Sequence, residues 1–263
     1  MFAIRLAGES ETKVAKHRKR RRGLCAYCGQ MCEVTRDHVI PKCLFTMPLP
    51  KVMVTVPACD ACHGKKSRHE DFLRDLLTMD IVGSESPVAQ RLFHEKVLSS
   101  HRQGKSLVCR IAMAQARQTP IVTPAGVYVD ECYVAHLDLD RVIEMFSFIV
   151  RGLYFRLRKV VLSPDCKFDV RRLGVEDAMK CWGGFEEYGY NGPYILGGGV
   201  FWCVCQYAAS DDGITNWMLV FYERVYYGVV TTPPGFVSGP KGRDCGTEGN
   251  LKTLIHDGVM RDD

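Results

Sequence analysis

Two Cys-x-x-Cys pairs constrain this chain more than any other feature. They are formed by Cys25 and Cys28, and by Cys59 and Cys62. Each pair has the spacing of a knuckle that presents two thiolates to a tetrahedral zinc ion, and two knuckles fill a four-coordinate site. Cys32 lies near the first pair, but four ligands are already available, so we expect it not to bind the metal. The sequence therefore predicts a small module folded around one structural zinc.

Three further residues within this stretch have no role in holding a zinc ion. Asp37 and His38 lie between the two cysteine pairs, and His63 directly follows the second pair. A carboxylate and two imidazoles around a small space suit the hydrolysis of a phosphodiester with a divalent metal. Each residue alone also has an ordinary explanation: a turn acceptor, a satisfied histidine and a helix cap. Their grouping between two zinc knuckles favours a functional site.

The same stretch carries a resemblance to a known family. Residues 37–45 read Asp-His-Val-Ile-Pro-Lys-Cys-Leu-Phe, and residues 56–62 read Val-Pro-Ala-Cys-Asp-Ala-Cys. These segments are similar to those of bacterial HNH endonucleases of the four-cysteine kind, whose ββα-metal motif surrounds a structural zinc. The resemblance covers residues 24–80, which is less than a third of the chain.

The resemblance implies a metal-dependent endonuclease that hydrolyses phosphodiester bonds, with double-stranded DNA as the expected nucleic-acid substrate. His38 would be the general base that activates water, since an imidazole titrates near neutral pH. Asp37 and His63 would bind one Mg²⁺ or Mn²⁺ ion, and the zinc on the four cysteines would be purely structural. The residues expected to hold backbone phosphates are Lys42, Lys65, Lys66 and Arg68.

One residue departs from the family pattern. Many members carry an asparagine a few residues before the second knuckle, where this chain has Val54. That asparagine ties the loop to the base, so its absence leaves the support of His38 open. It also keeps an alternative function open: an inactive, zinc-stabilised module that binds nucleic acid or another protein.

The rest of the chain divides by composition and periodicity. Residues 1–23 form a tail whose basic run suits phosphate contact or a solvated surface equally well. Residues 24–80 form the zinc module, with expected strands at 33–38 and 52–56 and a helix that continues to Met79. Residues 81–263 form a region of unknown role.

In that region, local patterns predict helices first and strands later. Ser86 and Pro87 begin a helix that runs towards Gly104, and a second helix covers 107–117. Short strands are expected at 127–129 and 132–134, followed by a long helix over 139–159. Aromatic and β-branched runs at 200–207, 217–222 and 225–230 predict an antiparallel sheet packed on that helix. The expected fold class is α+β.

Composition limits the environment and the partners. Net charge is +5, which is compatible with nucleic-acid binding but is too small to indicate it. The chain has thirteen cysteines, and the two pairs that suit zinc favour a reducing compartment such as the cytoplasm. We interpret the cysteines after residue 100 as small buried apolar residues. No apolar run is long enough to span a membrane. The sequence leaves the oligomeric state open.

Overall fold

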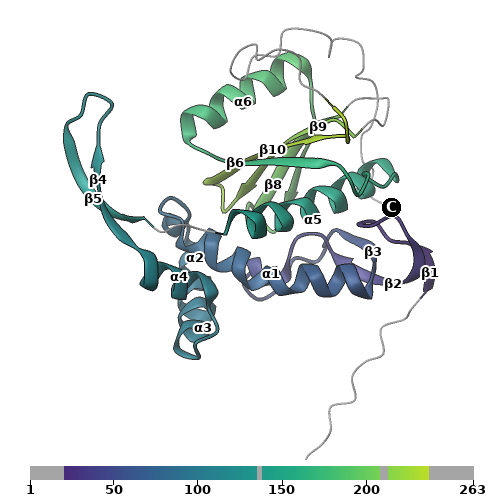
Figure 1. Ribbon diagram of the computed structural model, residues 1–263, viewed down its shortest axis with the longest axis horizontal. Helices are drawn as coiled ribbons and strands as arrows, with labels where there is room; N and C mark the ends of the chain where they lie inside the picture. The colour runs from purple at the N-terminus through teal and green to yellow at the C-terminus, as the bar shows by residue number, and fades with distance from the viewer. Residues whose placement is uncertain (1–20, 135–137, 208–212, 237–263) are drawn as a thin grey trace, which may run out of the picture.

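The computed structural model describes residues 21–134, 138–207 and 213–236 (Figure 1). It shows a mixed α+β chain with a three-stranded sheet near the N-terminus, a group of helices, and a five-stranded antiparallel sheet. This arrangement confirms the expected class and order of elements. Most of the basic tail, residues 1–20, lies outside the described residues. Within the described part of the chain, no helix combines the length and apolarity needed to cross a membrane.

The N-terminal sheet has the order β1-β2-β3, formed by Arg21–Leu24, Met31–His38 and Thr55–Cys59. The expected strand at 52–56 was therefore wrong in its bounds. Residues in β2 and β3 pair so that His38 faces Thr55 and Val34 faces Cys59, which carries the second cysteine pair to the first. Val52 lies outside the strand and is exposed. Pro57 is tolerated in β3 because this strand lies at the sheet edge.

The expected helix after the second knuckle is confirmed as α1, Asp60–Met79. A single-turn helix, η1, covers Lys42–Leu44 in the loop between β2 and β3. The helix expected from Ser86 towards Gly104 consists of three consecutive helical segments: α2 (Pro87–Leu92), the π-helical η3 (Phe93–Val97) and α3 (Leu98–Arg102). A short turn, η2 (Gly83–Glu85), precedes it, and α4 (Leu107–Gln115) follows it.

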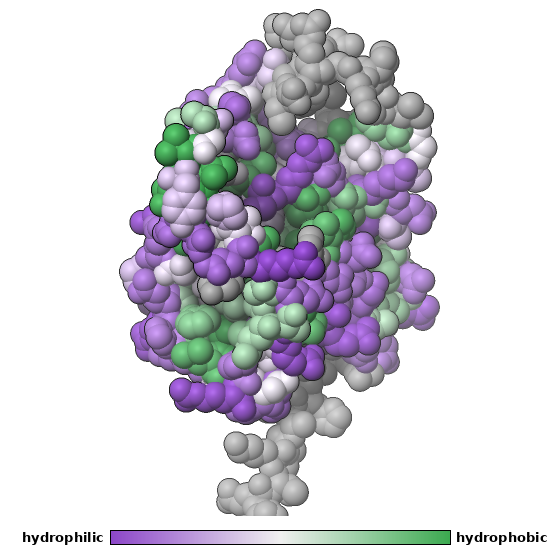
Figure 2. All heavy atoms as spheres, turned by 60° about the vertical axis from the view of Figure 1, so that its left-hand side comes forward, coloured by the Kyte–Doolittle hydropathy of each residue, from purple (hydrophilic) through white to green (hydrophobic). Residues whose placement is uncertain are grey.

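A two-stranded hairpin projects from the body of the protein after α4 (Figure 1). It pairs β4 (Arg117–Val122) with β5 (Tyr128–Val134). The two short strands expected at 127–134 are thus one strand, and its partner β4 was missed because it contains Pro120 and polar residues. On the side of the molecule shown in Figure 2, hydrophobic residues form separate patches among hydrophilic ones.

The C-terminal sheet has the order β6-β10-β9-β8-β7, and its neighbouring strands are antiparallel. The three predicted strands are confirmed as β8 (Phe201–Tyr207), β9 (Thr215–Phe221) and β10 (Val225–Thr232). Sequence patterns did not reveal the outer strands β6 (Lys167–Leu173) and β7 (Asn191–Leu196), or the helix α6 (Val175–Tyr188). Helix α6 lies on the sheet face opposite the long helix α5 (Figure 1).

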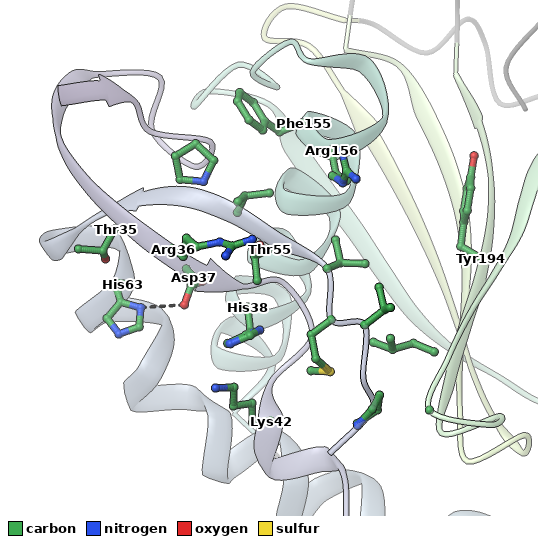
Figure 3. Close-up of a pocket in the computed structure, with 18 of the residues that line it drawn as sticks. Thr35, Arg36, Asp37, His38, Lys42, Thr55, His63, Phe155, Arg156 and Tyr194 are labelled. Carbon is green, nitrogen blue, oxygen red and sulfur yellow. Dashed lines mark hydrogen bonds and ion pairs between the residues drawn. The ribbon is translucent and has the colours of Figure 1, made fainter. Parts of the chain in front are cut away.

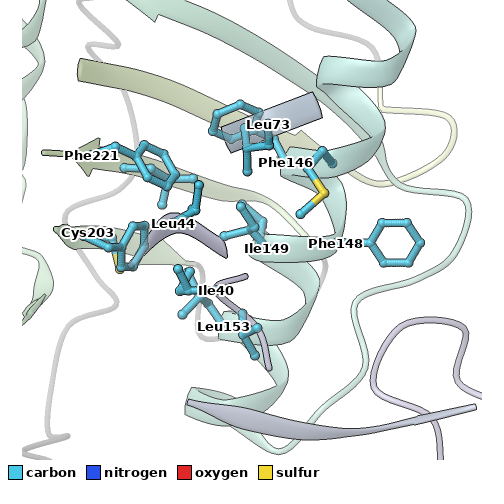
Figure 4. Close-up of a cluster of buried hydrophobic side chains, with 14 of the residues drawn as sticks. Ile40, Leu44, Leu73, Phe146, Phe148, Ile149, Leu153, Cys203 and Phe221 are labelled. Atoms are coloured by element: carbon cyan, nitrogen blue, oxygen red, sulfur yellow. The ribbon is translucent and has the colours of Figure 1, made fainter. Parts of the chain in front are cut away.

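Helix α5, Leu139–Arg158, joins the two sheets into one hydrophobic core. Its middle turns are buried almost all round, as expected for a helix covered on several sides. Figure 4 shows Phe146, Ile149 and Leu153 of α5 in one cluster with Ile40 of the zinc module and Phe221 of the sheet. The core therefore crosses the expected boundary at residue 80.

Helix α5 passes very close to the loop after β2. A Cβ atom added at Gly152 would lie 2.8 Å from both Cγ atoms of Val39, so only glycine fits there without a shift. Val39 directly follows His38. The position of α5 is thus coupled to the end of β2, where the candidate site begins.

The cysteines after residue 100 largely follow the expected pattern. Cys181 is only half-buried, and neither the Cys132 side chain nor Cys245 is among the described parts of the chain. The buried ones are Cys109, Cys166, Cys203 and Cys205.

Candidate metal centre and adjacent cleft

The two cysteine pairs form one cluster. The sulfur atoms of Cys25, Cys28, Cys59 and Cys62 all lie within 4.8 Å of one another, and the Cys28 and Cys59 sulfurs are 4.0 Å apart. Thiolates about 2.3 Å from a tetrahedral zinc are separated by about 3.8 Å, so the cluster fits a structural zinc. Its ligands come from the turn after β1, the end of β3 and the first turn of α1.

The backbone supports this cluster at two points. The Cys59 N–H donates to Cys25 Sγ and the Cys62 N–H donates to Cys59 Sγ, each at 3.4 Å. Burial raises the pKa of the Cys28 and Cys62 thiols, and a bound cation would favour the ionised form of both. Cys32 instead donates to the Gln30 carbonyl and lies outside the cluster, as expected.

Asp37 occupies the centre of a buried polar network at the other end of β2. Its Oδ2 accepts hydrogen bonds from the Tyr27 hydroxyl at 2.6 Å and the Lys66 ammonium at 3.1 Å. Its Oδ1 lies 2.7 Å from Nδ1 of His63 (Figure 3). Burial alone would raise the pKa of Asp37, but the Lys66 ammonium and the hydrogen bonds outweigh it and lower that pKa. Asp37 is therefore a carboxylate.

The structure corrects the expected role of Lys66. Its side chain is fully buried, so the ammonium does not reach solvent or a phosphate. It donates to Glu70 Oε1 at 2.9 Å and to the His38 carbonyl, in addition to Asp37. Lys66 lies at helical spacing from the buried residues Leu73 and Leu77. This periodicity could have predicted that the Lys66 side chain lies on the buried face of α1.

His38 lies at the C-terminal end of β2 and lines a cleft. Burial, followed by the nearby Lys42 cation, lowers its pKa below the ordinary value, so the ring is neutral near pH 7. Its Nδ1 atom is buried and has no hydrogen-bond partner among the residues that the structure describes. Val39, the residue after His38, is held by the backbone of Val54: the Val39 N–H donates to the Val54 carbonyl at 3.0 Å. A main-chain hydrogen bond thus ties this loop to the end of β2.

The remaining predicted phosphate-binding residues lie at different places. Lys42 is exposed and lines the cleft. Lys65 and Arg68 are exposed on α1 outside the cleft lining, and Lys65 pairs with Glu144 of α5. Of the four predicted residues, only Lys42 shares the cleft with Asp37, His38 and His63.

The cleft has a volume of about 1980 Å³ and lies between the N-terminal sheet and β7. Four arginines that sequence analysis did not assign to the site line it. Arg156 projects from the last turn of α5 (Figure 3), where a cation also interacts favourably with the helix dipole. The others, on β1 and β2, are Arg21, Arg22 and Arg36. The sequence does not reveal that these arginines share a cleft, because β1 and β2 are distant in sequence from α5 and only tertiary packing brings them to one cleft.

Comparisons with protein-family models, with curated proteins and with solved structures found no match for this chain. Its function is therefore inferred from its own residues and their geometry.

Proposed function

We propose that this protein is a metal-dependent endonuclease that hydrolyses phosphodiester bonds of DNA. The observation that carries the proposal is the convergence of a carboxylate and two imidazoles in one basic cleft. Asp37, His38 and His63 all line that cleft, and their neighbours include Arg36 and Lys42. A phosphodiester brings negative charge to the site, and hydrolysis needs a base and a cation beside it.

Asp37 and His63 fit the first two protein ligands of a divalent metal. Their facing atoms, Oδ1 and Nδ1, are 2.7 Å apart, close to the roughly 3.0 Å between adjacent ligands of an octahedral Mg²⁺. Tyr27 and Lys66 occupy the other oxygen of Asp37, which leaves Oδ1 directed at His63. When bound, the metal would supply positive charge to a phosphate oxygen and the leaving 3′ oxygen.

His38 supplies the base in this proposal. A neutral imidazole can take a proton from water, and its lowered pKa keeps it neutral under physiological conditions. The resulting hydroxide attacks phosphorus and the bond to the 3′ oxygen breaks. The 3′ oxygen then takes a proton from solvent, and the phosphate stays on the 5′ oxygen of the other fragment. The Lys66 ammonium donates to the His38 carbonyl, and this contact positions the base.

The test is cleavage of supercoiled plasmid and of a single-stranded oligonucleotide with Mg²⁺ or Mn²⁺. The His38→Ala protein should cut at least about 100-fold more slowly than wild type. His94→Ala is the matched control, because His94 is exposed on η3 and outside the cleft lining, and it should retain the full rate. Folded, zinc-loaded wild-type protein that cuts with none of the divalent metals supplied would contradict the proposal, as would equal rates for wild type and His38→Ala.

The proposed ligand pair has its own test. His63→Ala should raise the Mn²⁺ concentration needed for half-maximal cutting and leave the zinc content unchanged, because His63 is not part of the cysteine cluster. Unchanged Mn²⁺ dependence would remove His63 from the metal site.

A second candidate is an inactive zinc-stabilised binding module. It is favoured by the Asp37 network, in which Tyr27, Lys66 and His63 already contact both carboxylate oxygens. This candidate predicts nucleic-acid binding that persists in His38→Ala and needs no second metal. Loss of the zinc site, as in Cys25→Ser, should abolish that binding.

A further inference from the structure

The two walls of the cleft differ in charge. The wall formed by the N-terminal sheet and the loop between β2 and β3 carries four cations: Arg21, Arg22, Arg36 and Lys42. The opposite wall is formed by residues 190–198, which include β7. Among the described residues that line this second wall, none carries a charge. Arg156 lines the cleft from the end of α5.

The uncharged wall offers aromatic surface. Tyr194 of β7 is half-buried, and Figure 3 shows it across the cleft from Asp37 and His38. Tyr190 also lines this wall, and its ring packs against Trp182 of α6 with centroids 5.3 Å apart. Strand β7 lies at the edge of the sheet, beyond β8. The wall thus combines aromatic side chains with the outermost described strand of the sheet.

This asymmetry distinguishes between two forms of nucleic acid. A duplex carries phosphates around its outside, so a cleft built for a duplex would need cations on both walls. A single strand has phosphates along one side and bases along the other. Proteins that bind single strands combine a basic track for the backbone with aromatic side chains on which bases stack.

We propose that the cleft binds one unpaired strand of nucleic acid, with its phosphates on the arginine wall and its bases on the β7 wall. This deepens the proposed endonuclease function and rests on it. It gives the C-terminal sheet a role, since β7 holds the bases while the zinc module holds the scissile phosphate. It also changes the expected substrate from a duplex to a single-stranded or locally opened segment.

The test is binding, measured by fluorescence anisotropy without added divalent metal, so that it does not depend on cutting. The probes are a labelled DNA strand of about 16 nucleotides, an RNA strand of the same sequence, and the blunt DNA duplex. At about 50 mM salt, at least one strand should bind roughly tenfold or more tightly than the duplex. The DNA and RNA strands distinguish which sugar the cleft prefers.

Variants of Tyr194 assign the base-binding wall. Tyr194→Leu keeps apolar volume but removes the ring, and it should weaken strand binding roughly 5- to 150-fold. Tyr194→Phe keeps the ring and should bind as wild type does. Tyr128→Leu is the control, because Tyr128 is an exposed tyrosine on the projecting hairpin. Thermal unfolding of each variant shows that it is folded.

On the other wall, Arg36→Gln should weaken binding and reduce the salt dependence of the affinity by about one unit of slope. Duplex binding as tight as strand binding, or a folded Tyr194→Leu that binds the strand like wild type, would overturn the inference. Duplex binding together with metal-dependent cutting would leave the proposed nuclease standing. Strand binding that depends on Tyr194 without any cutting would instead support the cleft assignment and refute the nuclease.

Discussion

The two ends of the β2–β3 pair are held in different ways. At one end, the cysteine cluster draws its ligands from short local spacings and fits one zinc ion. At the other end, Asp37 and His38 depend on a buried lysine, on Tyr27 and on the close passage of α5. The first end presents four thiols that fit one metal ion, whereas the second is held by buried side chains of the zinc module and by helix α5 of the C-terminal region. The comparison teaches that the zinc module and the C-terminal region together form the cleft that Asp37 and His38 line.

The largest expected effect comes from removing a zinc ligand. A structural zinc contributes on the order of 10 kcal/mol of apparent stability, so Cys25→Ser should lose the metal and unfold the module. Metal analysis and thermal unfolding measure both consequences. Cys32→Ser is the control and should keep one zinc per chain, since Cys32 lies outside the cluster. Loss of zinc from Cys32→Ser would break the assignment of the four ligands.

The next effect concerns the buried lysine. Lys66→Met would leave Asp37 and Glu70 without their buried cation and should cost about 3–5 kcal/mol in the free energy of unfolding. Its neighbour Lys65 is 55% exposed where it pairs with Glu144, so Lys65→Met should cost about 0–1 kcal/mol. Urea denaturation of both variants compares them. Equal costs would contradict the account of Lys66 as the ion that holds the Asp37 end together.

A smaller effect tests the contact of α5 with the end of β2. Gly152→Ala places a methyl group against the side chain of Val39 and should cost about 1–3 kcal/mol. In α6, an added Cβ at Gly183 meets open space, so Gly183→Ala should be neutral or stabilising by up to about 1 kcal/mol. Urea denaturation again gives the values. If the two alanine variants are equally stable, α5 does not constrain the loop after His38.

Local patterns predicted the parts of the molecule that local interactions define. The Cys-x-x-Cys spacing located the metal cluster, and helical periodicity located α1 and α5. The aromatic and β-branched runs located β8, β9 and β10. Each of these features is encoded by residues that lie close together in the sequence.

The sequence did not reveal features that depend on distant partners. The bounds of β3 follow from its register with β2, which pairs Val34 with Cys59. Lys66 was expected on the surface because lysine is rarely buried unless paired, and its partner Asp37 is far away in sequence. Strand β7 has little alternation of its own, yet it forms one wall of the cleft. Only tertiary packing places Arg156 and Tyr194 near the Asp37 end.

The pH dependence of cutting tests the central claim most directly. The rate should be measured under single-turnover conditions at saturating Mn²⁺, so that metal occupancy does not limit it. His38 must be neutral to act as a base, and burial together with Lys42 lowers its pKa. We therefore expect the rate to rise with pH along an acid limb centred below about 6.5 and to level off near neutral pH. A rate independent of pH from about 5 to 8, with chemistry rate-limiting, would contradict His38 as the general base.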